Sequence, residues 1–134
     1  MNWIFKSIAA LTCTLLLAAC GGGGSSSAPP TVNVTGEWKG TARDASNGAT
    51  GSMSFSLNQV GADVGGSFSS PTNTCLKVGS ISGTVSGNEF TGKIASGDAT
   101  GTFIATVVGN AMSGTYEAKS ATCGSGKGSI NMTK

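Results

Sequence analysis

From residue 32 to the C-terminus, hydrophobic and polar side chains alternate along the chain with a period of two residues. In the segment SMSFSLN, for example, Met53, Phe55 and Leu57 share one parity while serine and asparagine occupy the other. Such alternation predicts β-strands with one buried face and one hydrated face. No stretch shows the 3.6-residue period of an amphipathic helix. We therefore predict an all-β domain.

Eight segments with this pattern can be delimited between glycine-containing turns. They span residues 32–43, 51–60, 63–69, 75–86, 89–96, 99–109, 111–120 and 126–134. In the fourth segment the parity of the hydrophobic positions changes, because Leu76 and Val78 are even-numbered whereas Ile81 is odd-numbered. This change predicts a β-bulge near Gly79 and Ser80.

The connections between the segments differ in length. Residues 61–62, 87–88 and 109–110 are two-residue hairpin turns containing Gly or Asn, which accept positive φ. Residues 44–50, 70–74 and 121–125 form longer links, and 97–98 a shorter one. In an up-and-down meander the tight turns lie at one end, the tight-turn end, and the other links at the opposite, long-loop end. Since closure of the sheet removes both edges, we predict an eight-stranded antiparallel up-and-down β-barrel.

Bulky side chains of inward parity are predicted to fill this barrel. They are Val34, Trp38, Met53, Phe55, Leu57, Phe68, Ile81, Val85, Phe90, Ile94, Phe103, Val107, Met112, Tyr116, Ile130 and Met132. Several glycines share this parity, among them Gly40, Gly66, Gly92 and Gly114. They either enlarge a binding cavity or relieve crowding in a small, strongly coiled barrel. We favour the second interpretation, because eight strands enclose a space just wide enough for side chains.

The N-terminal region changes character twice before the first strand. A basic start with Lys6 precedes an uncharged apolar run at residues 8–19, which as a helix would rise about 18 Å, short of a roughly 30 Å hydrocarbon core. This pattern predicts a secretory signal peptide rather than a permanent membrane span. Residues 21–31 contain mainly glycine, serine and proline, which predicts a flexible linker with an end-to-end distance of about 18 Å.

The border between these two segments, Leu17-Ala18-Ala19-Cys20, resembles the lipobox of bacterial lipoproteins. The resemblance implies a diacylglycerol thioether on Cys20, cleavage after Ala19 and a third acyl chain, such as palmitate, on the new amino terminus. Several acyl chains anchor a protein more firmly than one. Because Gly21 rather than Asp follows the cysteine, the resemblance implies the outer membrane. The expected organisation is a signal peptide at 1–19, the lipidated cysteine and linker at 20–31, and the barrel domain at 32–134.

Cysteine usage agrees with export. Cys13 leaves with the signal peptide and Cys20 is acylated, so Cys75 and Cys123 remain as a pair in an oxidising compartment. We expect a disulfide between them, which would stabilise the fold by about 4 kcal/mol. A metal site is the rival use of the two thiols, but the sequence contains no histidine to complete it. No cofactor is expected.

Composition argues against catalysis and against nucleic-acid binding. Histidine, the commonest general base, is absent, and the expected disulfide leaves no free thiol nucleophile. Asp44 and Asp98 could meet at the long-loop end but are interpreted as solvated loop residues, and GSGKGS at 124–129 lacks the spacing of a phosphate-binding loop. Without Lys6, seven basic residues face six acidic ones, with no polybasic run. We predict that the protein is not an enzyme and does not bind nucleic acid.

A second resemblance concerns the barrel. The segment TGEWKGT at 35–41 carries a Gly-x-Trp that is similar to the opening strand of lipocalin and avidin barrels, and EFTGKI and MSGTYEA look like avidin's repeated strand pattern. The resemblance implies a calycin-like barrel architecture. Avidin has a polar residue after the Trp motif and several further tryptophans, whereas here Lys39 follows Trp38, so no binding residue is transferred.

These observations predict a lipid-anchored, non-catalytic module that binds an envelope component or an extracellular protein. The linker joins the first strand at the tight-turn end, so we expect the long-loop end to point away from the membrane and to act as a recognition rim. The rim consists of Arg43, Asp44, Asn47, Asn73, Lys77, Asp98, Lys119 and Lys127. The alternative is a carrier of a small apolar ligand inside the barrel, and a purely structural envelope protein would have much the same sequence.

Overall fold

The computed structural model describes residues 26–134. The predicted signal peptide and lipobox, including Cys20, lie outside the described residues. The described chain forms eight strands: β1 (Gly36–Asp44), β2 (Thr50–Val60), β3 (Asp63–Ser69), β4 (Val78–Ser86), β5 (Glu89–Ser96), β6 (Ala99–Val108), β7 (Ala111–Ser120) and β8 (Gly124–Thr133). Between residues 26 and 134, no helix is long and apolar enough to cross a membrane.

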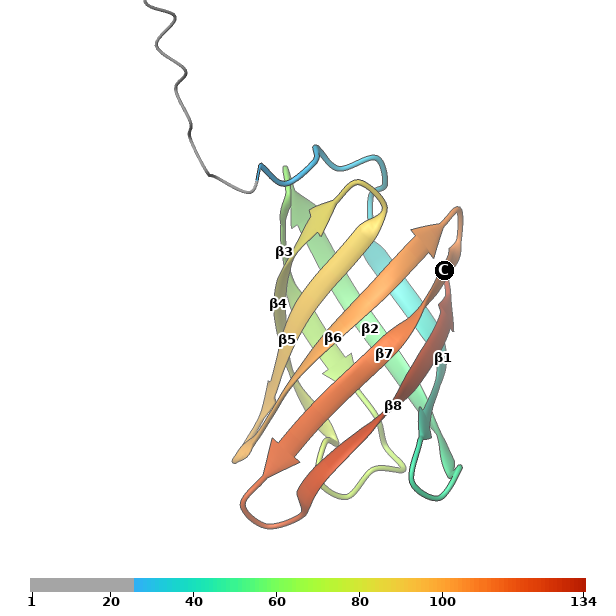
Figure 1. Cartoon of the computed structure of the whole chain (residues 1–134), viewed down its shortest axis with the longest axis vertical. Coiled ribbons are helices and arrows are strands. Elements are labelled where there is room, and N and C mark those ends of the chain that lie inside the picture. Colours follow the sequence, from blue (N-terminus) through green and yellow to red (C-terminus); the bar gives the residue numbers. More distant parts are fainter. Residues whose placement is uncertain (1–25) are drawn as a thin grey trace, which may run out of the picture.

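The eight strands form one closed barrel in which every strand pairs antiparallel with its neighbours in sequence, and β8 closes the ring on β1 (Figure 1). The predicted up-and-down meander is therefore confirmed. The turns after β2, β4 and β6 lie at the tight-turn end, and Gly61, Gly87 and Gly109 occupy their first positions with φ of +62°, +57° and +58°. This placement fits type II′ hairpin turns. No other residue type in the described chain adopts positive φ, so the asparagines do not contribute it as predicted.

The predicted bulge in β4 is wrong. The pairing of β4 with β3 and with β5 runs without interruption, for instance from Val78 opposite Ser69 to Thr84 opposite Asp63. Leu76 lies in the loop before β4 and is buried from there, whereas Val78 is 62% exposed. The change of parity therefore marks the start of the strand rather than an extra residue within it.

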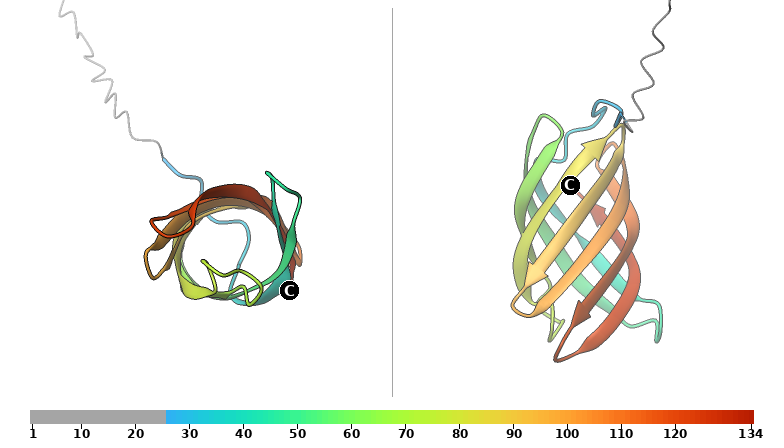
Figure 2. Two further views of the ribbon diagram at one scale, coloured as in Figure 1. Left: turned by 90° about the horizontal axis from the view of Figure 1, so that it is seen from below. Right: turned by 60° about the vertical axis from the view of Figure 1, so that its left-hand side comes forward.

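The first strand also begins later than predicted, at Gly36. The residues before it cross the tight-turn end of the barrel, as the end-on view in Figure 2 shows. A φ of +126° at Gly36 lets the chain bend from this segment into β1. Val34 is fully buried, its carbonyl accepts a 2.8 Å hydrogen bond from the Trp38 indole, and the Thr31 amide donates to the Gly87 carbonyl at 2.8 Å. The segment from Thr31 to Val34 thus closes this end of the barrel, and we call it the N-terminal plug.

The interior is filled by the side chains that alternation assigned to it. All of the predicted core residues are buried except Tyr116, which is half-buried. Phe103 lies near the centre, with Phe90 edge-on at 4.9 Å and Phe55 at 5.6 Å between ring centroids. Such aromatic pairs add to the stability gained by burial. Four further hydrophobic residues that the sequence analysis did not include are also buried: Val64, Leu76, Ala99 and Ala105.

The inward glycines mark places where no side chain fits. A Cβ atom on Gly92 would overlap the Phe103 ring, and one on Gly40, Gly66 or Gly114 would overlap the backbone of the neighbouring strand. These residues therefore permit close approach of strands and rings. The crowding interpretation is confirmed, and the glycines do not enlarge a cavity.

The predicted disulfide is present between Cys75 and Cys123, whose Cα atoms are 6.3 Å apart. Cys75 lies in the β3–β4 loop and Cys123 in the β7–β8 loop. Because these loops are four strands apart in a ring of eight, the disulfide spans the opening of the barrel at its long-loop end. The β3–β4 loop folds over this opening (Figure 2). Its Leu76 is buried and lines the small internal cavity.

Candidate functional site

All residues of the predicted recognition rim lie at or near the long-loop end. They are Arg43 and Asp44 at the end of β1, Asn47 in the β1–β2 loop, Asn73 and Lys77 in the β3–β4 loop, Asp98 in the β5–β6 turn, Lys119 on β7 and Lys127 on β8. They surround the opening from several sides. The structure does not bring them together into one patch, and their roles differ.

The two aspartates of the rim hold separate loops. Asp98 accepts hydrogen bonds from the Ser120 hydroxyl at 2.9 Å and from the Thr122 amide and hydroxyl at 3.1 and 3.0 Å. These bonds, that of Ser120 first, lower the pKa of Asp98. Asp44 accepts from the Ser46 hydroxyl and amide, which lower the pKa of Asp44. Since the two carboxylates belong to loops four strands apart, they form no acid–base pair.

The two asparagines of the rim also stabilise their own loops. The Asn73 side-chain oxygen accepts hydrogen bonds from the amides of Cys75 and Leu76 at 2.8 and 2.9 Å. The Asn47 oxygen accepts from the Ala49 amide at 2.8 Å. Such bonds from Asn side chains to nearby amides are typical of ordered turns. The acidic and amide side chains of the rim therefore shape the loops, and the cationic side chains remain as candidates for recognition.

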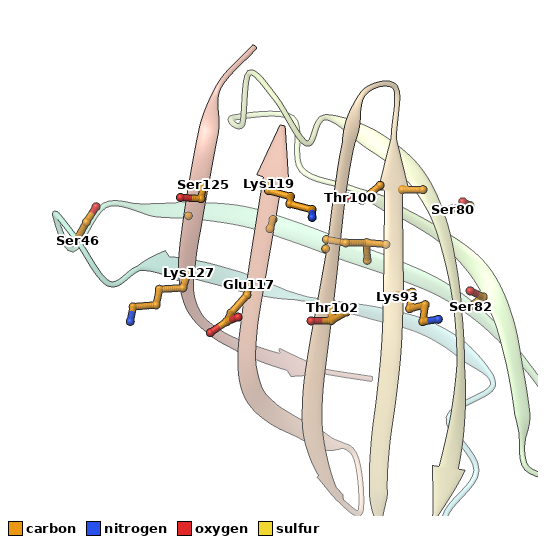
Figure 3. Close-up of a pocket in the computed structure, with 15 residues that line it drawn as sticks. Ser46, Ser80, Ser82, Lys93, Thr100, Thr102, Glu117, Lys119, Ser125 and Lys127 are labelled. Atoms are coloured by element: carbon orange, nitrogen blue, oxygen red, sulfur yellow. The ribbon is translucent and has the colours of Figure 1, made fainter. Parts of the chain in front are cut away.

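Two of these cations, Lys119 and Lys127, line a groove of about 1010 Å³ on the outer surface of the barrel (Figure 3). The groove lies over β4 to β8 in the half nearer the long-loop end. Exposed side chains from all five strands line it, together with Ser46 from the β1–β2 loop. These side chains are Ser46, Ser80, Ser82, Lys93, Ala95, Thr100, Thr102, Glu117, Lys119, Ser125 and Lys127.

Strand register arranges the lining in two parallel rows. Directly paired residues on neighbouring strands form each row. One row is Ser80, Ala95, Thr100, Lys119 and Ser125, and the other is Ser82, Lys93, Thr102, Glu117 and Lys127. With about 4.8 Å between strands, a row across five strands is about 19 Å long. The groove is therefore an elongated site on a rigid sheet.

The groove is positively charged and presents both polar and apolar groups. Its charged side chains are three lysines and one glutamate, which gives a net charge of +2. Six serine and threonine hydroxyls lie among them, and no lining residue is aromatic. Glu117 is directly opposite Lys127 on the neighbouring strand, and a cross-strand pair of opposite charges stabilises a sheet modestly.

A second hollow of about 700 Å³ adjoins this groove at the end of β1. It contains Arg43 and the half-buried Tyr116, and it shares Glu117 and Lys127 with the groove. Burial, and to a lesser extent the negative charge of Asp44, raises the pKa of Tyr116, so its hydroxyl is neutral at physiological pH. The two hollows thus meet at these residues of β7 and β8.

The interior offers little space by comparison. The cavity beneath the β3–β4 loop has a volume of about 20 Å³ and is bounded by residues including Asn73, Leu76, Phe103 and Tyr116. This volume holds about one water molecule. Within residues 26–134, no three His, Cys, Asp or Glu side chains gather closely enough to hold a metal ion.

Comparison with models of known protein families and with curated proteins finds no match to this chain. The assignment of a function therefore depends on the site itself.

Sequence reasoning missed Lys93 and Glu117 as members of the groove, because outward residues were assigned only to a hydrated face. A signal for them was present. Two-residue turns fix the register of the strands that they join, so the predicted turns at 87–88, 97–98 and 109–110 already imply that Ser82, Lys93, Thr102 and Glu117 form one row.

Proposed function

We propose that this chain is a lipid-anchored, non-catalytic lipoprotein of the bacterial outer membrane that binds an envelope or extracellular partner. The recognition surface in this proposal is the groove over β4 to β8 together with the neighbouring long-loop end. One observation carries the proposal: an exposed, positively charged groove of about 1010 Å³ lies on the outer surface, whereas the barrel interior is filled.

The polarity of the fold supports this arrangement. The described chain enters the barrel at the tight-turn end, where Thr31 and Val34 are held by hydrogen bonds and burial. A lipid anchor on Cys20 would therefore attach at the end opposite the long loops. The resemblance of Leu17-Ala18-Ala19-Cys20 to a lipobox is the basis for that anchor and for the outer-membrane location.

Two observations speak against the other functions considered. The carboxylates of Asp44 and Asp98 are committed to separate loops, which leaves no acid–base pair at the long-loop end. A carrier of a small apolar ligand needs a pocket of several hundred Å³, and the internal cavity of about 20 Å³ is far below that size. Both observations favour a binding role on the outer surface.

Partner capture from the native envelope tests this proposal. The full-length chain is expressed in its own host, cross-linked in intact cells and recovered with its neighbours. The charge-reversal variant Lys119→Glu/Lys127→Glu should lose the partner because both side chains line the groove. The matched variant Lys39→Glu/Lys134→Glu makes the same charge change toward the tight-turn end and should keep it.

The opposite pattern, with capture lost only in the tight-turn variant, would refute the proposed polarity. Anchoring is tested separately by labelling with palmitate. Label should enter the wild-type chain and be absent from Cys20→Ser, and an unlabelled wild-type chain would contradict the lipid anchor.

A further inference from the structure

We propose that the groove binds an acidic polysaccharide: an extended chain of hydroxylated sugars that carry carboxylate or sulfate groups. This inference rests on the proposed function as a surface binding module and adds the chemical class of its ligand. Three features of the groove support it, namely its shape, the chemistry of its side chains and the spacing of its charges.

The shape fits a segment of a linear polymer. The two rows of side chains cross five strands over about 19 Å, and all of the row side chains are exposed. Figure 3 shows the labelled side chains arranged side by side along the groove rather than converging on a point. A compact small molecule would contact only part of such a site, whereas an extended chain can contact each strand in turn.

The side-chain chemistry matches sugars with anionic groups. Serine and threonine hydroxyls both donate and accept hydrogen bonds, as sugar hydroxyls do, and each lysine ammonium offers three donors to a carboxylate or sulfate. Hydrogen bonds between charged partners are the stronger ones. The strands of the groove present five hydroxyls and three ammonium groups on one sheet, so binding would order few loops.

The charges are spaced rather than dense. Lys93 on β5 and Lys119 on β7 are two strands apart, about 10 Å, and Lys127 follows on β8 in the row of Lys93. Glu117 lies between these lysines and would repel a continuous array of anions. A polymer with separated anionic groups and neutral hydroxyls between them fits this pattern better than a chain of adjacent phosphates.

Other macromolecules fit less well. Protein interfaces depend on buried aromatic or arginine anchors, and single-stranded nucleic acids stack their bases on aromatic side chains. The groove lining contains neither aromatic side chains nor arginine. A membrane surface also fits less well, because with the proposed anchor on Cys20 the groove would lie in the half of the barrel away from the membrane.

The test uses the full-length chain in mild detergent and titration calorimetry at several salt concentrations. The probes are polygalacturonate, dextran sulfate and uncharged dextran. We expect binding of at least one acidic polymer and none of dextran. Lys93→Gln/Lys127→Gln should weaken binding about tenfold and flatten its salt dependence, because two cationic contacts are lost. The matched variant Lys39→Gln/Lys134→Gln removes the same charge toward the tight-turn end and should change affinity less than about twofold.

Several results would overturn the inference. Equal weakening in both double variants would show that only net charge matters. Tighter binding of single-stranded DNA or of phosphatidylglycerol vesicles through the same lysines would assign the groove to a different ligand class. Absence of polysaccharide binding, together with partner capture that still depends on Lys119 and Lys127, would reject the polysaccharide and leave the proposed function intact. If polysaccharide binding is absent and partner capture no longer depends on Lys119 and Lys127, both the polysaccharide inference and the proposed function are rejected.

Discussion

The two ends of this barrel are closed in different ways. At the tight-turn end the chain's own N-terminal segment is the plug: Gln59 accepts from the Val34 amide at 2.8 Å and donates to the Val32 carbonyl at 3.3 Å, and the Trp38 indole donates to Val34. At the long-loop end a folded loop covers the opening, and the Cys75–Cys123 disulfide holds it. One end is closed by packing and the other by a covalent link.

The inward side chains differ in size between the two ends of β7 and β8. Toward the tight-turn end they are Met112 and Met132, both at most 2% exposed. Toward the long-loop end they are Ala118 and Gly126, whereas β2 and β3 contribute Met53 and Phe68 at that end. In many proteins binding sites lie on loops and outer surfaces that a stable scaffold positions. Four predictions test this contrast.

The largest effect is expected from Trp38→Ala. The side chain is fully buried and its indole hydrogen bond holds the plug, so truncation should lower the free energy of unfolding by about 3–5 kcal/mol. Denaturant unfolding measures this value. Trp38→Phe retains an aromatic ring and should lower the free energy of unfolding by a smaller amount. A loss of equal size from Tyr116→Ala, which removes a half-buried ring near the long-loop end, would contradict the contrast between the ends.

Removal of the disulfide acts on the opposite end. Its 48-residue sequence separation predicts that Cys75→Ser/Cys123→Ser lowers the free energy of unfolding by about 4 kcal/mol, mainly by releasing the unfolded chain. Hydrogen exchange should show additional local loss of protection in residues 70–77 and 121–125. Protection of the N-terminal plug should follow the global stability alone, and a local loss of protection there would show that the ends are coupled.

A pair of glycine substitutions measures the space at each end. A Cβ on Gly114 would overlap the backbone of β6, so Gly114→Ala should lower the free energy of unfolding by about 1–3 kcal/mol. A Cβ on Gly126 would meet only the Asp44 carboxylate at 3.9 Å, so Gly126→Ala should be neutral or slightly stabilising. Thermal melting compares the two variants, and similar losses would show that the barrel wall at Gly126 is as tightly packed as that at Gly114.

Much of this fold is predictable from local pattern. Alternation assigned the inward set, including Trp38 and Phe103, and the alternating lengths of the connections gave the meander. The disulfide followed from the two cysteines that remain when the expected signal cleavage and acylation are assumed. These features depend on the period of two and on turn chemistry, which the sequence displays directly.

The errors arose where the backbone leaves the regular pattern. Val34 and Leu76 are buried from segments outside the strands, and parity cannot distinguish this arrangement from a strand extension or a bulge. The groove was missed for another reason, since Lys93 and Glu117 come together only through register across several strands. Register was implied by the turns, but the hollow itself results from twist and side-chain length, which no local pattern specifies.

The smallest effect concerns Asp98, which orders the β7–β8 loop through Ser120 and Thr122. Its pKa is lowered in the folded protein, so the stabilisation is present above the ordinary Asp pKa and is lost as the pH falls through the lower folded value. The Thr122 amide proton followed by NMR should therefore titrate with a midpoint below 3.8. Asp98→Asn keeps the size of the side chain without its charge and should abolish this titration. Because the carboxylate is fully exposed, the free energy of unfolding should hardly change. If amide protons of the N-terminal plug titrated with the same midpoint, the effect of Asp98 would not be confined to its own loop.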